Sequence, residues 1–262
     1  PADWASTQGN VPFDCDSLSR RIHGQTLHET LFVPFARQVM NRDASHLAAL
    51  YHRLPWLPMY WPQTLLASLS THPGMPATVF NYPSHGSIAA ICQNLTQMVR
   101  NHPLITLVED PIQQVRRTAD HFVITTARHG EIHAQRLGWA MTPNRGMAVA
   151  GMTAPAENPE RLPLMLGFFK LAESQVHQVV SVLHAVANDT GIYRVTNATA
   201  CGTPTDEGTM RLVVEANPHR FAAHHVGIDL NDESAVMQAM LRDLSTIGVT
   251  ASSIRPIGFE LK

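Results

Sequence analysis

The segment Y-P-S-H-G-S-I-A-A-I-C-Q-N-L-T-Q-M-V runs from Tyr82 to Val99 and carries a clear helical pattern. Its apolar residues recur every three or four positions, which predicts an amphipathic helix over residues 87–100. The run I-T-L-V at 105–108 follows His102-Pro103 and is short and apolar, so it predicts a buried strand. This helix and strand predict a small unit of mixed α and β structure.

A hairpin is predicted next along the chain. Residues 121–127 and 131–139 flank His129-Gly130, a dipeptide that suits a turn between two strands. The turn A-M-T-P at 140–143 follows the second strand. The order of helix, strand, hairpin and turn is more informative than any one of these motifs.

The segments on either side have different patterns. Residues 17–35 predict one or two helices broken at Gly24 or Pro34, and residues 45–54 and 63–69 predict two more. Residues 192–200 and 211–216 predict a long hairpin, residues 234–247 a helix that ends before Gly248, and residues 254–261 a closing strand. The fold class expected is α+β, with a helical part at 1–74, a small α/β unit at 75–143, and a mostly antiparallel sheet with one long helix at 144–262.

Composition excludes several functions. The net charge is −2 and 15% of the residues are charged, so the chain offers no field that would steer nucleic acid or anionic lipid. No apolar run approaches the length of a membrane span. Cys15, Cys92 and Cys201 lie far apart, which favours free thiols in a reducing, cytoplasmic setting.

The order of elements resembles the middle of the FAD-dependent amine oxidase superfamily, which includes phytoene desaturases, protoporphyrinogen oxidases and UDP-galactopyranose mutases. The matching parts are Tyr82-Pro83 with Gly86, the helix that follows, Pro111-Ile112, and the turn at 140–143. His85-Gly86 departs from the two adjacent glycines that the family usually has. The resemblance implies a partial FAD-binding unit at 75–143, between a helical part of the substrate domain at 1–74 and its sheet and helix at 144–262.

The resemblance also implies functional residues. The backbone of Ile112 would meet the adenine of FAD, and Thr142 would lie on the cofactor side of its turn. Arg37 follows F-V-P-F at 32–35, a pattern typical of the substrate region, and Tyr60 and Trp61 would form a wall of an apolar substrate pocket. The alternatives are an ordinary strand residue for Ile112, a solvated helix-end charge for Arg37, and loop packing for the two aromatic residues. No catalytic residue is identified.

The chain carries no G-x-G-x-x-G motif after a strand, so the turn that binds the pyrophosphate of a dinucleotide is not expected in it. It is therefore interpreted as the central part of a flavoenzyme, present as an expressed segment, a proteolytic remnant or a subunit. FAD is expected in the complete protein, with weak or no binding by this chain alone. A small-molecule substrate is expected, together with a homo-oligomer or a partner chain that supplies the missing FAD-binding pieces.

No metal site is predicted. His224-His225 lie near His219, but a metal ion there would need a carboxylate at the right geometry, and exposed loop histidines are the simpler interpretation. The adjacent acids Glu109-Asp110 are interpreted as turn and solvated charges rather than an acid/base pair.

A second functional class stays open. The chain could be a cofactor-free α+β module for binding or assembly that has kept the scaffold of the enzymes. Flavin absorbance of the complete protein distinguishes this module from an oxidoreductase.

Overall fold

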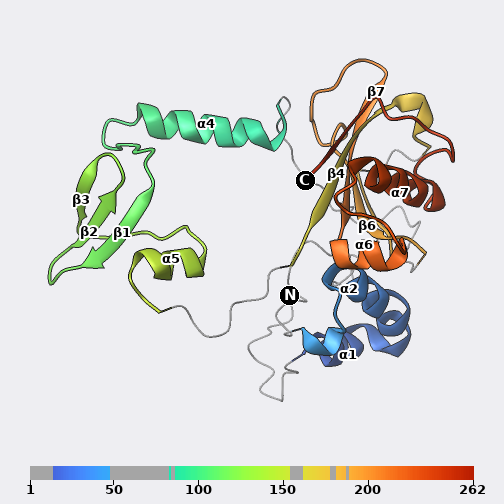
Figure 1. Ribbon diagram of the computed structural model, residues 1–262, viewed down its shortest axis with the longest axis horizontal. Helices are drawn as coiled ribbons and strands as arrows, with labels where there is room; N and C mark the ends of the chain where they lie inside the picture. The colour runs from blue at the N-terminus through green and yellow to red at the C-terminus, as the bar shows by residue number, and fades with distance from the viewer. Residues whose placement is uncertain (1–13, 48–82, 84–85, 154–161, 178–180, 187–188) are drawn as a thin grey trace, which may run out of the picture. The chain divides into compact units, whose positions relative to one another are not determined.

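The computed structural model describes residues 14–47, 83, 86–153, 162–177, 181–186 and 189–262 (Figure 1). Two compact units divide the chain, and each is described by itself. The larger unit draws on Pro1–Ile91 and Leu162–Lys262, and the smaller unit is Cys92–Arg161. None of the described helices is long and apolar enough to cross a membrane.

A five-stranded antiparallel sheet forms the centre of the larger unit. Its strands lie in the order β5 (Val182–His184), β6 (Ile192–Asn197), β7 (Thr209–Ala216), β4 (Met165–Ala172) and β8 (Gly258–Leu261). The predicted hairpin is confirmed as β6 and β7, and the predicted closing strand is confirmed as β8. Alternate residues of β4 are buried, which is typical of a strand with one face on the core.

Helix α7 (Glu233–Thr246) covers the core side of this sheet and confirms the helix predicted at 234–247. It begins after Asp232, whose side chain accepts from the N–H groups of Ser234 and Ala235 at 3.0 and 3.1 Å. It approaches β4 closely, because a Cβ atom at Gly167 would lie 2.5 Å from Met240 Sδ. A shorter helix, α6 (Pro218–His224), was not predicted and fills what was expected to be loop.

The N-terminal helices belong to the same unit. They are α1 (Cys15–Leu27), the π-helical turn η1 (His28–Phe32), α2 (Val33–Met40) and the 3-10 turn η2 (Ala44–His46). The predicted break falls at Gly24, whose φ of 77° is outside the helical region. Pro34 does not end the helical segment, because the π-helical turn η1 runs directly into α2, in which Pro34 is the second residue. Beyond Leu47, the helices predicted at 45–54 and 63–69 lie outside the described residues.

Helix α2 is held against the sheet by long-range contacts. The Phe35 ring is buried and meets the Tyr193 ring edge-on at 6.3 Å. The Gln38 side chain donates to the carbonyl of Ile192 at 3.2 Å, and the Asn217 amide donates to the carbonyl of Val39 at 3.0 Å. These contacts join residues that lie more than 150 positions apart in the sequence.

The smaller unit contains a three-stranded antiparallel sheet in the order β1 (Ile112–Arg117), β2 (Phe122–Thr126) and β3 (Gly130–Ala134). The predicted hairpin is confirmed as β2 and β3, although β3 ends earlier than expected. Helix α5 (Pro143–Val149) contacts β1 and was not predicted. Val115 and Val123 are buried in this unit.

Helix α4 (Ser87–Asn101) confirms the predicted amphipathic helix and enters the smaller unit at Cys92. None of its side chains is buried, so the described residues leave its apolar face uncovered. The strand predicted at 105–108 is wrong, because this segment has no regular structure and its apolar side chains are exposed. No described strand lies beside it to pair with, and residues 112–117 form the strand instead.

Candidate functional site

The turn between β2 and β3 is held by a carboxylate from another segment. The Asp110 side chain has no exposed surface, and Oδ2 accepts from the N–H groups of Arg128 and His129 at 2.8 and 3.0 Å. It also lies 2.8 Å from His129 Nδ1, while Oδ1 accepts from Arg128 Nε at 3.3 Å. Gly130, with a φ of 74°, closes the three-residue turn in a conformation that favours glycine.

These contacts fix the charge of Asp110. Burial acts to raise its pKa, but the hydrogen bonds from the His129 side chain and from two backbone N–H groups outweigh it and hold the pKa well below its usual range. The sequence interpretation of Asp110 as a solvated charge is therefore wrong. The contacts with two backbone N–H groups and with Arg128 show that this carboxylate holds the turn in place.

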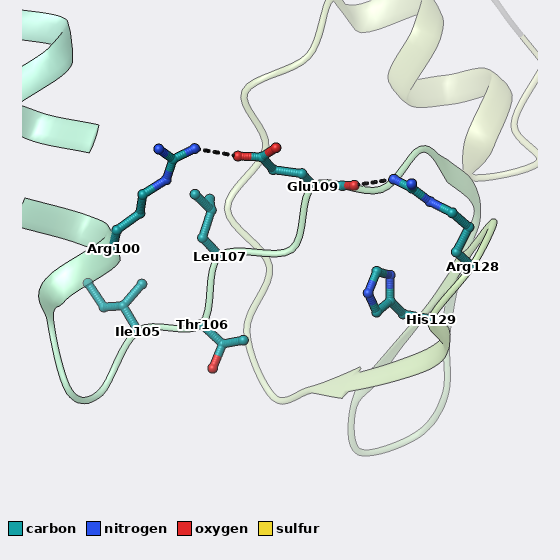
Figure 2. A pocket seen from close by; sticks show the side chains of 7 residues that line it. All are labelled: Arg100, Ile105, Thr106, Leu107, Glu109, Arg128 and His129. Atoms are coloured by element: carbon teal, nitrogen blue, oxygen red, sulfur yellow. Dashed lines mark hydrogen bonds and ion pairs between the residues drawn. The ribbon is translucent and has the colours of Figure 1, made fainter. Parts of the chain in front are cut away.

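A groove of about 590 Å³ lies between the end of α4, the segment that follows it and the β2–β3 turn (Figure 2). It is lined by Arg100, Ile105, Thr106, Leu107, Glu109, Arg128 and His129. Glu109 contacts both arginines that line this groove, Arg100 and Arg128. Its side chain accepts from Arg100 Nη2 at 2.7 Å, and its carbonyl accepts from Arg128 Nη2 at 2.5 Å.

The groove combines guanidinium and imidazole N–H groups with an apolar side formed by Ile105 and Leu107. Arg100 and Glu109 are both more than half exposed, so their ion pair adds little stability and can exchange for a ligand. Guanidinium groups stack on flat rings and donate to anionic oxygens. This chemistry suits the binding of a small, partly polar molecule.

Ile112 is the first residue of β1 and is half-buried. Its Cα is paired with that of Thr126, and the register shifts between Ile112 and Gln114, which marks a bulge. Among the described residues β1 is an edge strand, so one of its sides presents backbone N–H and C=O groups that no other strand uses.

Thr142 is the residue before α5 and is exposed. Its carbonyl accepts from the N–H of Gly146 at 2.9 Å, but its side chain makes no capping hydrogen bond. Helix α5 contacts β1, the strand that Ile112 begins. The structure therefore brings the two predicted cofactor residues into one small unit, on elements that touch.

Of the three predicted substrate residues, only Arg37 lies within the described residues. Arg37 lies in the last turn of α2, with its side chain 54% exposed, and its Nε donates to Asp43 Oδ1 at 2.6 Å. Phe32 and Phe35, which precede it, are buried in a core cluster. Tyr60 and Trp61 lie outside the described residues.

Sequence reasoning missed Arg100, Asp110 and Arg128 as a group. Their proximity depends on the fold, because Asp110 and Arg128 are 18 residues apart. The signals available were the turn dipeptide His129-Gly130 and the aspartate Asp110, which precedes Pro111 and is therefore restricted to an extended backbone. His224 and His225, interpreted as loop histidines, lie beside the carboxylate of Asp243.

No family model matches the sequence, and no curated protein matches it. Solved structures do match. Reduced UDP-galactopyranose mutase aligns over 98% of this chain and 56% of its own, with a TM-score of 0.68 and 12% identity. A putative protoporphyrinogen oxidase from Exiguobacterium sp. 255-15 aligns over 98% and 56%, with a TM-score of 0.58 and 14% identity. Cyclohexylamine oxidase from Brevibacterium oxydans IH-35A aligns over 95% and 52%, with a TM-score of 0.54 and 11% identity.

These matches confirm the predicted resemblance at the level of the fold. The mutase and the protoporphyrinogen oxidase belong to two of the enzyme groups that the sequence resembles. The chain spans about half the length of the solved structures it matches. The fold class is α+β, with the helices and antiparallel sheets of an amine oxidase-like fold.

Proposed function

We propose that this chain is part of an FAD-dependent oxidoreductase of the amine oxidase-like superfamily. Within that enzyme it contributes the adenine-side contacts of the cofactor and part of the substrate pocket. The observation that carries the proposal is the alignment of 98% of the chain with a UDP-galactopyranose mutase at a TM-score of 0.68. Fold alone does not determine activity, so the proposal also rests on the positions of Ile112 and Thr142.

The edge of β1 fits an adenine ring. Adenine needs one donor and one acceptor in a plane, and backbone groups of an edge strand supply both without dependence on the side chain. Ile112 stands at the start of that strand, directly after Pro111, which has a restricted φ and precedes the bulge. In this proposal Ile112 holds the adenine edge, and Thr142 contributes an exposed hydroxyl from the adjacent helix start.

The residues present do not supply the whole cofactor site. The sequence has no glycine-rich turn for a pyrophosphate, so that contact would come from the remaining half of the enzyme or from a partner chain. FAD, when bound, would accept or donate the electrons of the reaction. This chain would orient the cofactor and substrate. Arg37, Tyr60 and Trp61 are the proposed substrate-side residues.

Flavin content of the complete protein tests the proposal. We expect the protein purified from its native source to show flavin absorption bands and to release FAD on denaturation. A complete protein without flavin would contradict the oxidoreductase and favour the cofactor-free binding or assembly module. The exposed apolar face of α4 is the observation that favours such a module.

The adenine contact has its own test. In a crystal structure of the complete protein with FAD, the adenine is expected within hydrogen-bond distance of the Ile112 backbone. A separation of more than about 4 Å would remove this assignment while leaving the flavoprotein assignment intact. Ile112→Pro, which removes the N–H at a strand start, should weaken FAD binding, and the matched control Ile112→Val should not.

The cysteines are the basis for a proposed cellular compartment. Cys15 and Cys201 are buried, Cys92 is exposed, and none of the three forms a disulfide. Cysteines that form no disulfide are typical of a reducing compartment such as the cytoplasm.

A further inference from the structure

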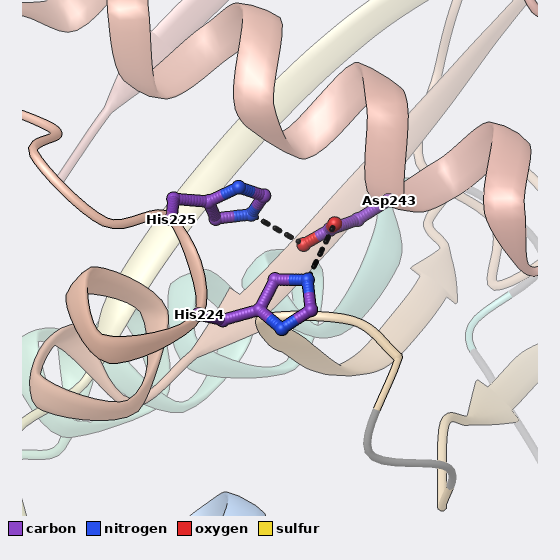
Figure 3. A group of neighbouring side chains, drawn as sticks. All are labelled: His224, His225 and Asp243. Carbon is purple, nitrogen blue, oxygen red and sulfur yellow. Dashed lines mark hydrogen bonds and ion pairs between the residues drawn. The ribbon is translucent and has the colours of Figure 1, made fainter.

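Two adjacent histidines and a buried carboxylate converge in the larger unit. His224 ends α6 and His225 follows it, and both imidazole rings point at the carboxylate of Asp243 on α7 (Figure 3). His225 Nε2 lies 3.1 Å from Asp243 Oδ2, and His224 Nε2 lies 4.0 Å from Asp243 Oδ1. One ligand atom from each residue can be chosen so that all three lie within 4.8 Å of one another.

Neighbouring side chains usually point apart, and the end of the helix explains why these two do not. His225 leaves the helical conformation, with φ −98° and ψ 72°, which turns its side chain back toward α7. The His225 ring packs on the buried Phe221 at 4.5 Å, and the two imidazoles meet edge-on at 4.7 Å. Packing therefore orients His225, while His224 remains partly exposed and able to adjust.

The carboxylate is buried without a permanent cation. Only 3% of the Asp243 side chain is exposed, and the described residues include no arginine or lysine that forms an ion pair with it. Oδ2 accepts from the N–H of Gly191 at 2.8 Å, which holds the carboxylate in place. Oδ1 is separated from His224 Nε2 by more than a hydrogen bond. A buried carboxylate is costly unless it is paired or binds a metal ion.

We propose that His224, His225 and Asp243 bind one divalent transition-metal ion of the Zn²⁺ class. Imidazole nitrogen and carboxylate oxygen are zinc ligands, and tetrahedral ligands at about 2.0–2.1 Å lie about 3.3 Å apart. The distances from His225 Nε2 to Asp243 Oδ2 and from His224 Nε2 to Asp243 Oδ1, 3.1 and 4.0 Å, lie on either side of that value. A small rotation of His224 would complete the set. A fourth position would be left to water on the exposed side.

The role assigned to this ion is structural. It would join the end of α6 to the last turn of α7, and the N–H of Gly191 would orient the ligating carboxylate. Because a preformed site exists only in the folded chain, the ion would stabilise the native state. The site is independent of the flavin proposal, since none of its residues is assigned to cofactor or substrate.

Calorimetric titration of the untagged, metal-free chain with ZnCl₂ tests the site. We expect one ion per chain, and a melting temperature that rises by about 5 °C or more at a hundredfold excess of zinc over Kd. Substitution of Co²⁺ should give the visible absorption bands of a tetrahedral ion. Absence of stoichiometric binding would show that the cluster is only a His–Asp hydrogen-bond pair and would overturn the proposal.

Variants separate this site from weak binding by surface histidines. His224→Ala should lower zinc affinity at least tenfold and leave the metal-free melting temperature nearly unchanged, because His224 is partly exposed and makes no hydrogen bond to Asp243. His219→Ala changes an exposed histidine on the same helix and is the matched control. Equal affinity in the His224 variant and the wild-type chain would overturn the assignment. Asp243→Asn should also lose binding and is judged only if its circular dichroism matches the wild type.

Discussion

Asp110 and His129 are 19 residues apart, yet the Asp110 carboxylate lies 2.8 Å from His129 Nδ1 and accepts from the His129 N–H at 3.0 Å. Because the same carboxylate also accepts from the N–H of Arg128, the segment before β1 and the β2–β3 turn are tied together. The groove beside this turn therefore has a fixed wall.

Removal of this carboxylate should loosen the turn. In Asp110→Ala the N–H of Arg128 loses its acceptor and the N–H of His129 keeps only Thr126 Oγ1 at 3.2 Å, so we expect exchange of both amides to accelerate, at least tenfold for Arg128. Hydrogen exchange measured by NMR is the test. The matched control is Glu109→Ala, which removes an exposed neighbouring carboxylate and should leave those two amides unchanged. Equal exchange rates in the two variants would contradict the role of Asp110.

The same carboxylate predicts sensitivity to acid. Its pKa in the folded chain lies below the ordinary value of 3.8, so the unfolded chain takes up this proton first as the pH falls. The contribution of Asp110 is thus complete above pH 3.8 and is lost progressively below it. Exchange of the Arg128 and His129 amides, followed from pH 5 downward and corrected for intrinsic rates, should report the loss. The dependence should vanish in Asp110→Ala.

Protonation of His184 should destabilise the fold at a higher pH than protonation of Asp110 does. Burial and the positive charge of Arg194 lower the pKa of His184 from 6.5 to about 4. The unfolded chain therefore binds the proton more readily, and the free energy of unfolding should fall between pH 6.5 and 4 by at most about 3 kcal/mol. Urea unfolding across this range measures the effect. His184→Leu should reduce the slope, whereas the exposed control His177→Leu should keep it.

Gly167→Ala tests the close approach of α7 to the sheet. The added Cβ would lie 2.5 Å from Met240 Sδ, and Met240 is fully buried, so the core must shift. We expect the free energy of unfolding to fall by about 1–3 kcal/mol, as in other overpacked cores. Gly258→Ala on β8 is the control, because a Cβ added there would lie 3.8 Å from the Lys170 Cβ, an ordinary contact distance. Equal stability losses at the two glycines would argue against close packing.

Self-association is predicted through the apolar segment at 105–108. Ile105, Leu107 and Val108 are exposed there. Exposed apolar area tends to be covered by another surface. Sedimentation should show a dimer or larger assembly that Leu107→Glu dissociates, while Val226→Glu, at an exposed apolar residue of the larger unit, should not. A monomer at high concentration would contradict the prediction.

The elements predicted correctly were those in which local signals agree. For α7, the helical period of its apolar residues and Gly248 beyond its end indicate the same helix. The β6–β7 hairpin likewise follows from two strand patterns separated by a turn. Burial in the finished fold strengthens these preferences and does not oppose them.

The smaller unit shows where local signals mislead. Residues 105–108 are more apolar than residues 112–117, yet the second segment is the strand, and only Val115 in it is buried. Its polar residues suit an edge strand with one face in solvent, so pairing with β2 determines the structure rather than apolar content.

The candidate sites depend on contacts that sequence alone does not reveal. In the sequence Asp110 looks like an ordinary turn residue, because its partner Arg128 lies 18 residues further along the chain. Asp243 offered one readable signal, since it follows Met240 by three positions on the core face of α7 and is therefore a carboxylate on an apolar stripe. Its histidine partners come from a helix that was not predicted.

The contact between Gln38 and Ile192 has a consequence for synthesis of the chain. The two residues are 154 positions apart, so at about 5–20 residues per second a ribosome needs roughly 8–30 s to make the partner of α2. During that interval the buried side of α2, including Phe35, has no sheet to cover it. The small β1–β2–β3 sheet, whose pairings are all local, can form well before the larger unit is complete.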